Sequence, residues 1–228
     1  MKKLVVITGA SSGIGMELAR RFSAEGHPVL MLARRREVME ELNLPNSLCR
    51  SVDVTDLEAL QSAVREAEEL YGKTDLLINC AGLMLLGYPA EQDFDEWSRM
   101  IDVNVKGVLT GTKAVLSDMI ARNEGTIINI SSIAGRKTFD NHPVYCGTKY
   151  AVHAMTESMR REVSGSNVRM IVIAPGVVET PLLSHTSNQE IKDNYNLWKQ
   201  EIDGGLEPSQ DCGLCLVCLP DAAGGLCA

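Results

Sequence analysis

The fold is decided by the stretch Thr8-Gly9-Ala10-Ser11-Ser12-Gly13-Ile14-Gly15, which joins an apolar run at residues 4–8 to a segment with helical spacing at residues 14–25. Glycines permit a tight turn and let the backbone approach a pyrophosphate, while the positive end of the following helix faces the anion. Strand, glycine-rich turn and helix in this order are the context that such a motif requires. The stretch therefore predicts a dinucleotide site, and a turn made glycine-rich only for packing is the alternative.

Beyond this stretch, short apolar runs alternate with longer segments at helical spacing, which is the pattern of βαβ units around a parallel sheet. Strands are predicted at residues 4–8, 28–33, 47–52, 75–79, 126–130 and 169–174. Helices are predicted at residues 14–25, 36–42, 57–71, 94–121, 145–164 and 188–199. The predicted fold class is α/β, a doubly wound, Rossmann-type parallel sheet in a single domain.

The domain is expected to span residues 1–206, and residues 207–228 are expected to form a divergent, cysteine-rich tail of the same domain. The polar segment 182–205 follows the last predicted strand. Ligands in open α/β sheets bind beyond the carboxyl ends of the strands, so this segment is expected to be a substrate loop. A plain surface excursion is the alternative.

The tail shows no β-branched seventh strand, so the final strand of the sheet is expected to be incomplete. Cys212, Cys215 and Cys218 have a spacing that zinc or an iron–sulfur cluster can use. A convincing fourth ligand is missing, so no metal is expected. A C-terminus altered by a change of reading frame is the other explanation that we consider.

The composition is that of an ordinary globular protein, because 45% of the 228 residues are hydrophobic and 23% are charged. A net charge of -8 argues against broad binding to nucleic acid or to a membrane surface. The apolar run after Met1-Lys2-Lys3 is too short for a signal peptide, and no run reaches the roughly 18 apolar residues of a membrane span. The odd, scattered cysteines favour a reducing compartment, and a cytoplasmic location is expected.

Three cations, Arg34, Arg35 and Arg36, follow the second predicted strand. An acidic residue at this place would hydrogen-bond the ribose 2'-hydroxyl of NAD and repel the 2'-phosphate of NADP. Guanidinium groups suit a phosphate dianion. The sequence therefore favours NADPH/NADP+ as the cofactor, and a charged helix start is the alternative.

Tyr145 and Lys149 are four residues apart and share one face of a predicted helix. The pKa of a tyrosine is ordinarily ~10. A nearby ammonium group is expected to lower the pKa of Tyr145 toward the range useful for general acid–base work. Ser132 lies just beyond the fifth predicted strand, where its hydroxyl can donate to a substrate carbonyl oxygen, and Ser131 competes for this role. An exposed helical pair is the alternative for the tyrosine and the lysine.

Further motifs stand in order along the chain: Asp53-Val54, Asn79-Cys80-Ala81-Gly82, Asn104, Ser132, Tyr145-x-x-x-Lys149 and Pro175-Gly176. Together with the Gly-x-x-x-Gly-x-Gly turn, they resemble the short-chain dehydrogenase/reductase family from residue 4 to about residue 205. The thirteen positions from Ser132 to Tyr145 are the spacing common in that family. The resemblance implies an NADP-dependent oxidoreductase whose catalytic set is Asn104, Ser132, Tyr145 and Lys149.

The resemblance also implies how the cofactor is held. Asp53 would accept a hydrogen bond from the adenine amino group, with Val54 beside the ring. The resemblance points to Arg34 first, and to Arg35 second, as the residue that binds the 2'-phosphate. The remaining implied contacts are Gly9, Ser11, Ser12, Gly13, Ile14, Gly15, Asn79, Ala81, Gly82, Tyr145, Lys149, Pro175, Gly176, Val178 and Thr180. Asn104 would help to hold a water in a proton relay with the lysine, and a helix-bending polar residue is the alternative.

Some residues depart from the family pattern or stand outside it. Cys80 occupies the place of a second Asn, so a hydrogen bond that ties neighbouring strands is expected to be absent. His142, His153 and His185 lack metal-ligand spacing and are expected to face solvent. Apolar residues that could line a substrate pocket, or equally belong to the core, are Met84, Leu85, Leu86, Val144, Leu182 and Leu183.

The predicted function is hydride transfer between NADP(H) and a small-molecule carbonyl or alcohol substrate. Tyr145 is the expected general acid/base, Ser132 holds the oxygen, and Lys149 grips the nicotinamide ribose. The alternative is an NADPH-binding protein that enhances the blue fluorescence of the cofactor with little turnover. The family resemblance implies a homodimer or homotetramer, and neither nucleic acid nor a membrane is an expected partner. The physiological substrate is not indicated by the sequence.

Overall fold

The structure, a computed structural model, describes residues 2–201 and 204–209. Its centre is a sheet with the strand order β3-β2-β1-β4-β5-β6, and every neighbouring pair is parallel. The strands are β1 Leu4–Thr8, β2 Val29–Ala33, β3 Ser47–Ser51, β4 Thr74–Asn79, β5 Gly125–Ile130 and β6 Val168–Ile173. The order reverses between β1 and β4, which is the doubly wound arrangement. The predicted fold class is confirmed.

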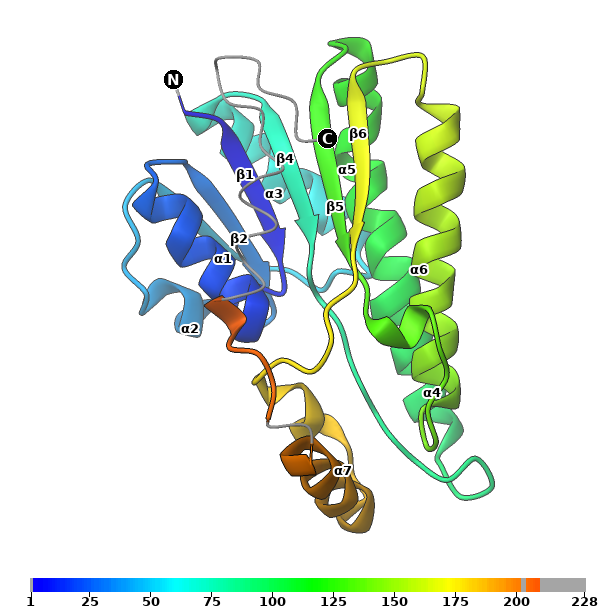
Figure 1. The fold of residues 1–228 in the computed structure, drawn as a ribbon. Helices are drawn as coiled ribbons and strands as arrows, with labels where there is room; N and C mark the ends of the chain where they lie inside the picture. Colours follow the sequence, from blue (N-terminus) through cyan, green and yellow to red (C-terminus); the bar gives the residue numbers. More distant parts are fainter. Residues whose placement is uncertain (1, 202–203, 210–228) are drawn as a thin grey trace.

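Helices cover both faces of this sheet, and one lies beyond its carboxyl edge (Figure 1). The helices are α1 Gly13–Ala24, α2 Arg36–Glu40, α3 Leu57–Tyr71, α4 Phe94–Ile101, α5 Gly107–Ala121, α6 Pro143–Glu162 and α7 Gln189–Glu201. Short 3-10 turns follow β5 at Ile133–Gly135 and β6 at Pro181–His185. In Figure 1 the strand arrows point toward α7, so that helix faces the edge where a ligand is expected.

Two hydrophobic cores result from the alternation of side chains along the strands. In β1, Val5 and Ile7 pack into one core with residues of α1 and α2, whereas Leu4 and Val6 pack into the other with residues of α3 and α5. All residues of β1 and β2 are buried, as is typical of central parallel strands covered on both faces. The cores fix the position of every strand end at the carboxyl edge.

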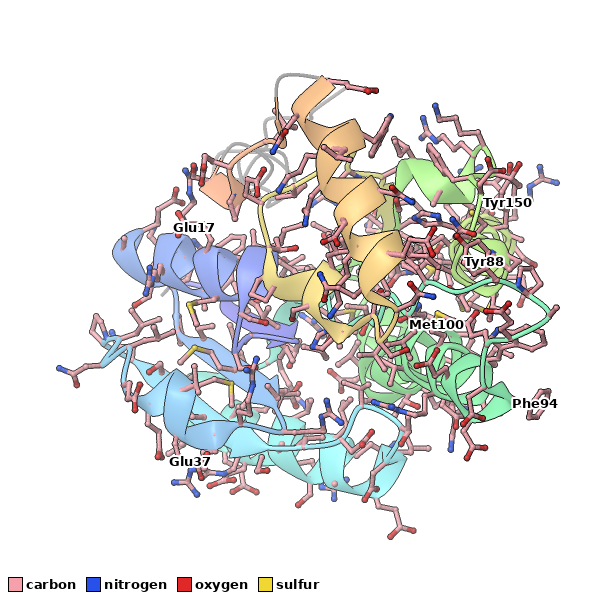
Figure 2. The ribbon with its side chains drawn as sticks, turned by 90° about the horizontal axis from the view of Figure 1, so that it is seen from below. Glu17, Glu37, Tyr88, Phe94, Met100 and Tyr150 are labelled. Atoms are coloured by element: carbon pink, nitrogen blue, oxygen red, sulfur yellow. The ribbon has the colours of Figure 1, made fainter. Side chains whose placement is uncertain are left out.

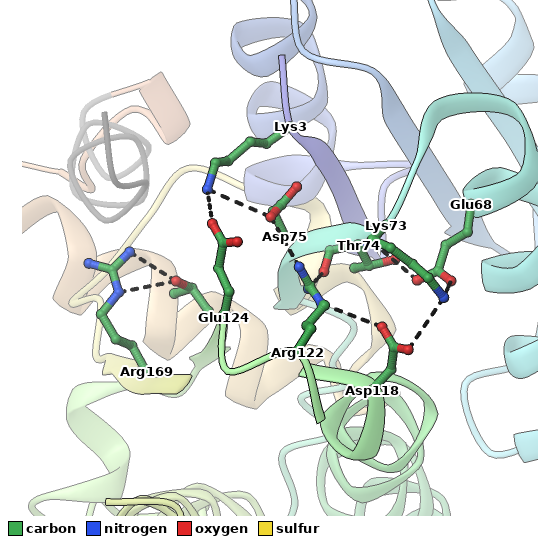
Figure 3. A network of polar contacts seen from close by, with 10 residues as sticks. Lys3, Glu68, Lys73, Thr74, Asp75, Asp118, Arg122, Glu124 and Arg169 are labelled. Carbon is green, nitrogen blue, oxygen red and sulfur yellow. Dashed lines mark hydrogen bonds and ion pairs between the residues drawn. The ribbon is translucent and has the colours of Figure 1, made fainter. Parts of the chain in front are cut away.

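The amino edge of the sheet is held by a network of ion pairs (Figure 3). Arg122, after α5, pairs with Asp75 of β4 at 3.3 Å and with Asp118 at 3.4 Å. Lys3, before β1, also reaches Asp75 at 3.7 Å, and Lys73 reaches Asp118 at 3.3 Å. These charges tie β1, β4 and α5 together at the edge opposite to the glycine turn, so they serve the fold.

Every predicted strand boundary lies within one residue of the structure, and the long predicted helix 94–121 has its predicted ends but contains an unpredicted π-helical turn. It is divided into α4 and α5 by a π-helical turn at Asp102–Lys106, which contains Asn104. Such turns are common at functional sites. Residues 210–228 lie outside the part of the chain that the structure describes. They include the region of the predicted incomplete final strand, all of the cysteines of the tail and the alternative metal site. Within the described part of the chain, no helix is long and apolar enough to cross a bilayer.

Candidate active site

The glycine turn after β1 lies directly against the end of β4. Gly9 has a φ of 70°, and a Cβ atom on it would lie 2.7 Å from Cα of Ala81. Thr8 supports the same contact, because its Oγ1 accepts hydrogen bonds from the backbone N–H groups of Cys80 (3.0 Å) and Ala81 (3.2 Å). Only glycine meets both demands at position 9, so the turn is fixed to the neighbouring strand without a side chain between them.

A cavity of about 810 Å³ opens along this carboxyl edge, a volume within the usual range of small-molecule sites. Most predicted site residues line it: Gly9, Ser11, Ser12, Gly13, Ile14, Arg34, Arg35, Asp53, Val54, Ala81, Gly82, Ser132, Tyr145, Lys149, Pro175, Gly176, Val178 and Thr180. Gly15, Asn79 and Asn104 do not. The structure therefore brings together residues spread from position 9 to position 180.

Gly15 and Asn79 act behind the cavity. A Cβ atom on Gly15 would lie 2.5 Å from the carbonyl oxygen of Gly9, so this glycine lets α1 pack on the turn. The side chain of Asn79 is buried and donates to Oδ1 of Asn129 on β5 at 2.8 Å, and Asn129 in turn donates to Thr156 of α6 at 2.8 Å. The side chain of Asn79 is therefore engaged with β5 and lies outside the cavity lining, and its contact with the cofactor stays a prediction.

A hydrogen bond between neighbouring strands is nevertheless present, and it is made by Asn79 rather than by the residue at position 80. The Asn79–Asn129 hydrogen bond joins β4 to β5 even though Cys80 replaces the second Asn of the family pattern. Cys80 itself lines the cavity, and burial raises the pKa of its thiol to about 12. At neutral pH this cysteine is an uncharged, unreactive thiol.

Asn104 is buried in the π-helical turn and binds backbone beside the cavity. Its Oδ1 accepts from the N–H of Leu83 (2.7 Å), and its Nδ2 donates to the carbonyl of Leu83 (2.8 Å) and to Thr148 Oγ1 (3.0 Å). A Cβ atom on Gly82 would lie 3.5 Å from Oδ1 of Asn104 and 3.8 Å from Nζ of Lys149. Asn104 and Lys149 thus approach the same point at the end of β4.

Tyr145, Lys149 and Ser132 meet at the centre of the cavity. All three side chains line the cavity, and the side chain of Ser132 acts on Tyr145 so as to lower the tyrosine pKa. Nζ of Lys149 donates to the carbonyl of Ile130 at 3.0 Å and lies 5.7 Å from the ring centroid of Tyr145. Ser131 does not compete with Ser132, because its hydroxyl is buried and donates to the carbonyl of Lys149 at 3.2 Å.

The pKa values of this group correct one expectation. Burial raises the pKa of Tyr145 well above its ordinary value, and only the side chain of Ser132 opposes this effect. Burial also lowers the pKa of Lys149 to about 8. The expected net lowering of the tyrosine pKa is wrong for this structure, because desolvation of the phenolate raises the pKa by more than a cation 5.7 Å from the ring centroid can lower it.

The far end of the cavity carries the predicted arginines. Arg34 and Arg35 are exposed and line the cavity, and Nη2 of Arg35 donates to Oγ of Ser11 in the glycine turn at 3.1 Å. Arg36 begins α2 and donates to Glu40 at 2.7 Å, as expected of a solvated helix start. Hydrogen bonds from Thr55 lower the pKa of Asp53, so its carboxylate is a hydrogen-bond acceptor at neutral pH.

The expectation that three histidines face solvent holds only for His185, which is exposed. His142 is half-buried and lines the cavity. His153 is half-buried, and among the described residues its Nε2 has no hydrogen-bond partner. Burial lowers the pKa of both His142 and His153, so both are neutral near pH 7.

Sequence reasoning missed the residues that close the cavity from the side of α7, which lies nearest the viewer in Figure 2. The segment that leads to α7 is anchored by buried Thr186, whose Oγ1 accepts from Leu86 N–H (3.1 Å) and donates to the Met84 carbonyl (3.3 Å). Tyr195 and Trp198 of α7 line the cavity. Their spacing of three residues in a predicted helix was the available signal.

Of the apolar residues predicted to line a pocket, Met84, Leu86, Leu182 and Leu183 do so. Leu85 and Val144 do not line it, and they belong to the hydrophobic cluster beneath it. Both alternatives for such residues, pocket and core, are therefore found, and within residues 84–86 the two outer side chains line the cavity while the middle one does not.

Comparison with known proteins agrees with this geometry. The model of the family described as short chain dehydrogenase matches residues 3–191. The chain belongs to the short-chain dehydrogenase family. An uncharacterized oxidoreductase of Staphylococcus saprophyticus is 42% identical to this short-chain dehydrogenase over 207 residues, which cover 88% of this chain and 84% of that protein.

Solved structures resemble this short-chain dehydrogenase along nearly its whole length. A closed form of serine dehydrogenase in complex with NADP+ is 32% identical and has a TM-score of 0.85, covering 95% of this chain and 90% of that one. A variant of the actinorhodin polyketide ketoreductase with NADPH is 29% identical and has a TM-score of 0.82, covering 94% and 89%.

We expect Gly9→Ala to destabilise the protein by roughly 2–5 kcal/mol, because a positive φ and a clash with the Ala81 backbone both oppose a side chain. Gly147→Ala is the control, since Gly147 lies in α6 and a Cβ atom on it would meet no other atom within 4 Å. Alanine there should stabilise the protein by up to about 1 kcal/mol. Urea unfolding measures both effects. Equal effects of the two substitutions would contradict the role of Gly9 in the turn.

Proposed function

We propose that this short-chain dehydrogenase transfers a hydride between NADP(H) and a carbonyl or alcohol group of a small molecule. The observation that carries the proposal is the meeting of Tyr145, Ser132 and Lys149 in one cavity that continues to the glycine turn, with Nζ of Lys149 5.7 Å from the ring centroid of Tyr145. A buried proton donor and a hydride site on the same cavity are what carbonyl reduction requires.

The residues present fit a bound NADP(H). The turn at Gly9 leaves backbone N–H groups open to a pyrophosphate, and Arg34 and Arg35 offer guanidinium groups to the 2'-phosphate. NADP+ and NADPH in the two similar structures support the same preference. When bound, NADPH supplies the hydride. Asp53 and Val54 would hold the adenine, and Val178 and Thr180 would hold the carboxamide.

The chain itself handles the proton. In reduction, Tyr145 donates its phenolic proton to the oxygen of the substrate carbonyl, and Ser132 holds that oxygen by a hydrogen bond. Because burial raises the pKa of Tyr145, the phenol is fully protonated at neutral pH and ready to act as the acid. Lys149 stabilises the phenolate that remains, and Asn104 holds the backbone of Leu83 beside the lysine.

We also propose that the domain comprises residues 1–206, with residues 182–205 as its substrate loop and residues 207–228 as its tail. The free thiols of Cys49, Cys80 and Cys146 support a reducing compartment, the cytoplasm. The alternative activity, NADPH binding with enhanced blue emission and little turnover, involves the same cavity and is separated from the first by the rate of substrate reduction.

We expect Tyr145→Phe to lower the rate of NADPH-dependent ketone reduction by a factor of about 10²–10⁴, because the proton donor is lost. NADPH binding should persist, since the ring remains. Tyr150→Phe is the matched control, because Tyr150 is exposed on the same helix and should leave the rate unchanged. Reductase activity retained in Tyr145→Phe would refute the proposed role. Tight NADPH binding by the wild type without any turnover would favour the alternative activity.

The reduction rate should depend on pH through Lys149. Tyr145 stays protonated because its pKa is raised, whereas Lys149 loses its proton as the pH rises through about 8. We therefore expect kcat/KM for reduction to be constant between pH 6 and 7 and to fall above about pH 8, as the charge that stabilises the phenolate disappears. A stopped-flow or steady-state pH profile measures this, and a flat profile to pH 9.5 would contradict it.

The double variant Arg34→Ala/Arg35→Ala should lower the affinity ratio of NADPH to NADH by about 10–100-fold, the value of one charge-assisted hydrogen bond to phosphate. Arg36→Ala is the control, because Arg36 pairs with Glu40 and does not line the cavity. Fluorescence titration with both cofactors gives the ratio. An unchanged ratio in the double variant, or an equal loss in the control, would show that another group selects the phosphate.

A homodimer or homotetramer is supported by large apolar side chains exposed on α4, α5 and α6. They are Phe94 (71% exposed), Ile101, Leu109, Ile120 and Tyr150, and Figure 2 places Phe94 and Tyr150 at the outer surface. We expect light scattering to give a mass of two or four chains of 24.8 kDa, and Leu109→Glu to reduce it. A wild-type mass of one chain would contradict an oligomer.

A further inference from the structure

Four aromatic side chains form one side of the cavity at the end occupied by Tyr145. Phe139 and His142 come from the segment between β5 and α6, and Tyr195 and Trp198 come from α7. We call these four residues the aromatic wall. The ring centroids are 5.7 Å apart for Phe139 and His142, 6.3 Å for Phe139 and Trp198, 6.2 Å for His142 and Tyr195, and 5.4 Å for Tyr195 and Trp198.

The aromatic wall is closed and continuous rather than a set of separate rings. Each of its members is within 6.3 Å of two others, which is the range of favourable aromatic pairs. The wall begins at the reacting centre, because the ring of His142 lies 6.1 Å from that of Tyr145. A group attached to the carbonyl carbon of a substrate therefore reaches the wall directly.

The ionisable groups around the wall are neutral, paired, placed over a ring or exposed on the rim, which favours an uncharged substrate. Burial lowers the pKa of His142, so that ring is neutral. Lys199 is paired with Glu179 at 2.9 Å, and Lys137 lies 4.7 Å above the ring of Phe139. Burial first, and then the charges of nearby arginines, lower the pKa of His185, so this ring too is neutral near pH 7. Asp140 also lines the cavity, and it lies on the exposed rim.

Apolar side chains complete this end of the cavity. Leu183 and Ile191 line it together with the wall, and Met84 and Leu86 line it from the segment after β4. Tyr195 adds apolar surface as well as a hydroxyl, and burial raises its pKa, so it too is uncharged. A substrate group bound here exchanges water for rings and aliphatic carbon.

We propose that the substrate is an uncharged ketone or aldehyde that carries an aromatic ring, and that this ring packs against the aromatic wall while the carbonyl lies at Tyr145 and Ser132. The chemistry rests on the proposed function. The carbonyl carbon receives the hydride from NADPH, the oxygen receives the proton of Tyr145, and the products are the alcohol and NADP+. An aromatic ring gains from edge-to-face contacts that a saturated ring of similar size does not make.

The test compares phenylacetone with cyclohexylacetone, which place a ring one methylene from equally reactive carbonyls. We expect kcat/KM with NADPH to be about two- to tenfold higher for phenylacetone, the range that an aromatic pair adds beyond buried area. Tyr195→Leu and Trp198→Leu should bring this ratio toward one. Trp97→Leu is the matched control, because Trp97 lies outside the cavity lining and should leave the ratio unchanged.

A wild-type ratio near one, or a ratio that the wall variants do not change, would overturn the inference while leaving reduction itself intact. Better turnover of a zwitterion such as serine with NADP+ would overturn it as well. If neither ketone is reduced, the proposed function fails, and binding then decides the inference. The chain has two tryptophans, so Trp97→Phe leaves Trp198 as the sole emitter. With NADP+ present, its emission should respond to benzamide at lower concentration than to cyclohexanecarboxamide, and equal responses would overturn the role of the wall.

Discussion

The contact of the glycine turn with the end of β4 is the constraint on which the site depends. Gly9 lies against the backbone of Ala81 with no side chain between them. Oγ1 of Thr8 accepts hydrogen bonds from the N–H groups of Cys80 and Ala81, which directly follow β4. The strand order reverses at this pair of strands, so the chain leaves β1 and β4 in opposite directions. A crevice opens between the segments that follow β1 and β4, and the cavity with its polar groups lies in this crevice.

A second constraint is the buried polar structure under the reacting groups. The π-helical turn places Asn104 where it satisfies both backbone groups of Leu83 and binds Thr148, one residue before Lys149. Asn129 joins β4 to α6 through Asn79 and Thr156. Because buried polar groups are costly when unpaired, these bonds hold the segment after β4 and the helix of Tyr145 in one arrangement. The positions of Tyr145 and Lys149 are thereby fixed.

Much of this could be predicted because it depends on local pattern. The glycine spacing, the apolar runs of the strands and the four-residue spacing of Tyr145 and Lys149 each specify a backbone geometry, and the structure has them. The hydrogen bond between Asn79 and Asn129 was not predicted, because its two residues are fifty positions apart in the sequence. The π-helical turn was missed because its cause is tertiary: Asn104 binds the backbone of Leu83, twenty-one positions away. The aromatic wall joins Phe139 to Trp198 across fifty-nine positions, and no local pattern connects them.

The central claim, hydride transfer in this cavity, is tested most directly by following the hydrogen itself. Phenylacetone is reduced with NADPH that carries deuterium on one face of C4 of the nicotinamide, and then with the opposite label, and the alcohol is analysed by mass spectrometry and NMR. The account predicts one deuterium on the carbinol carbon with one of the two labels and none with the other, because the protein holds the ring in one orientation. Alcohol without deuterium from either label, or deuterium from both in equal amounts, would contradict it.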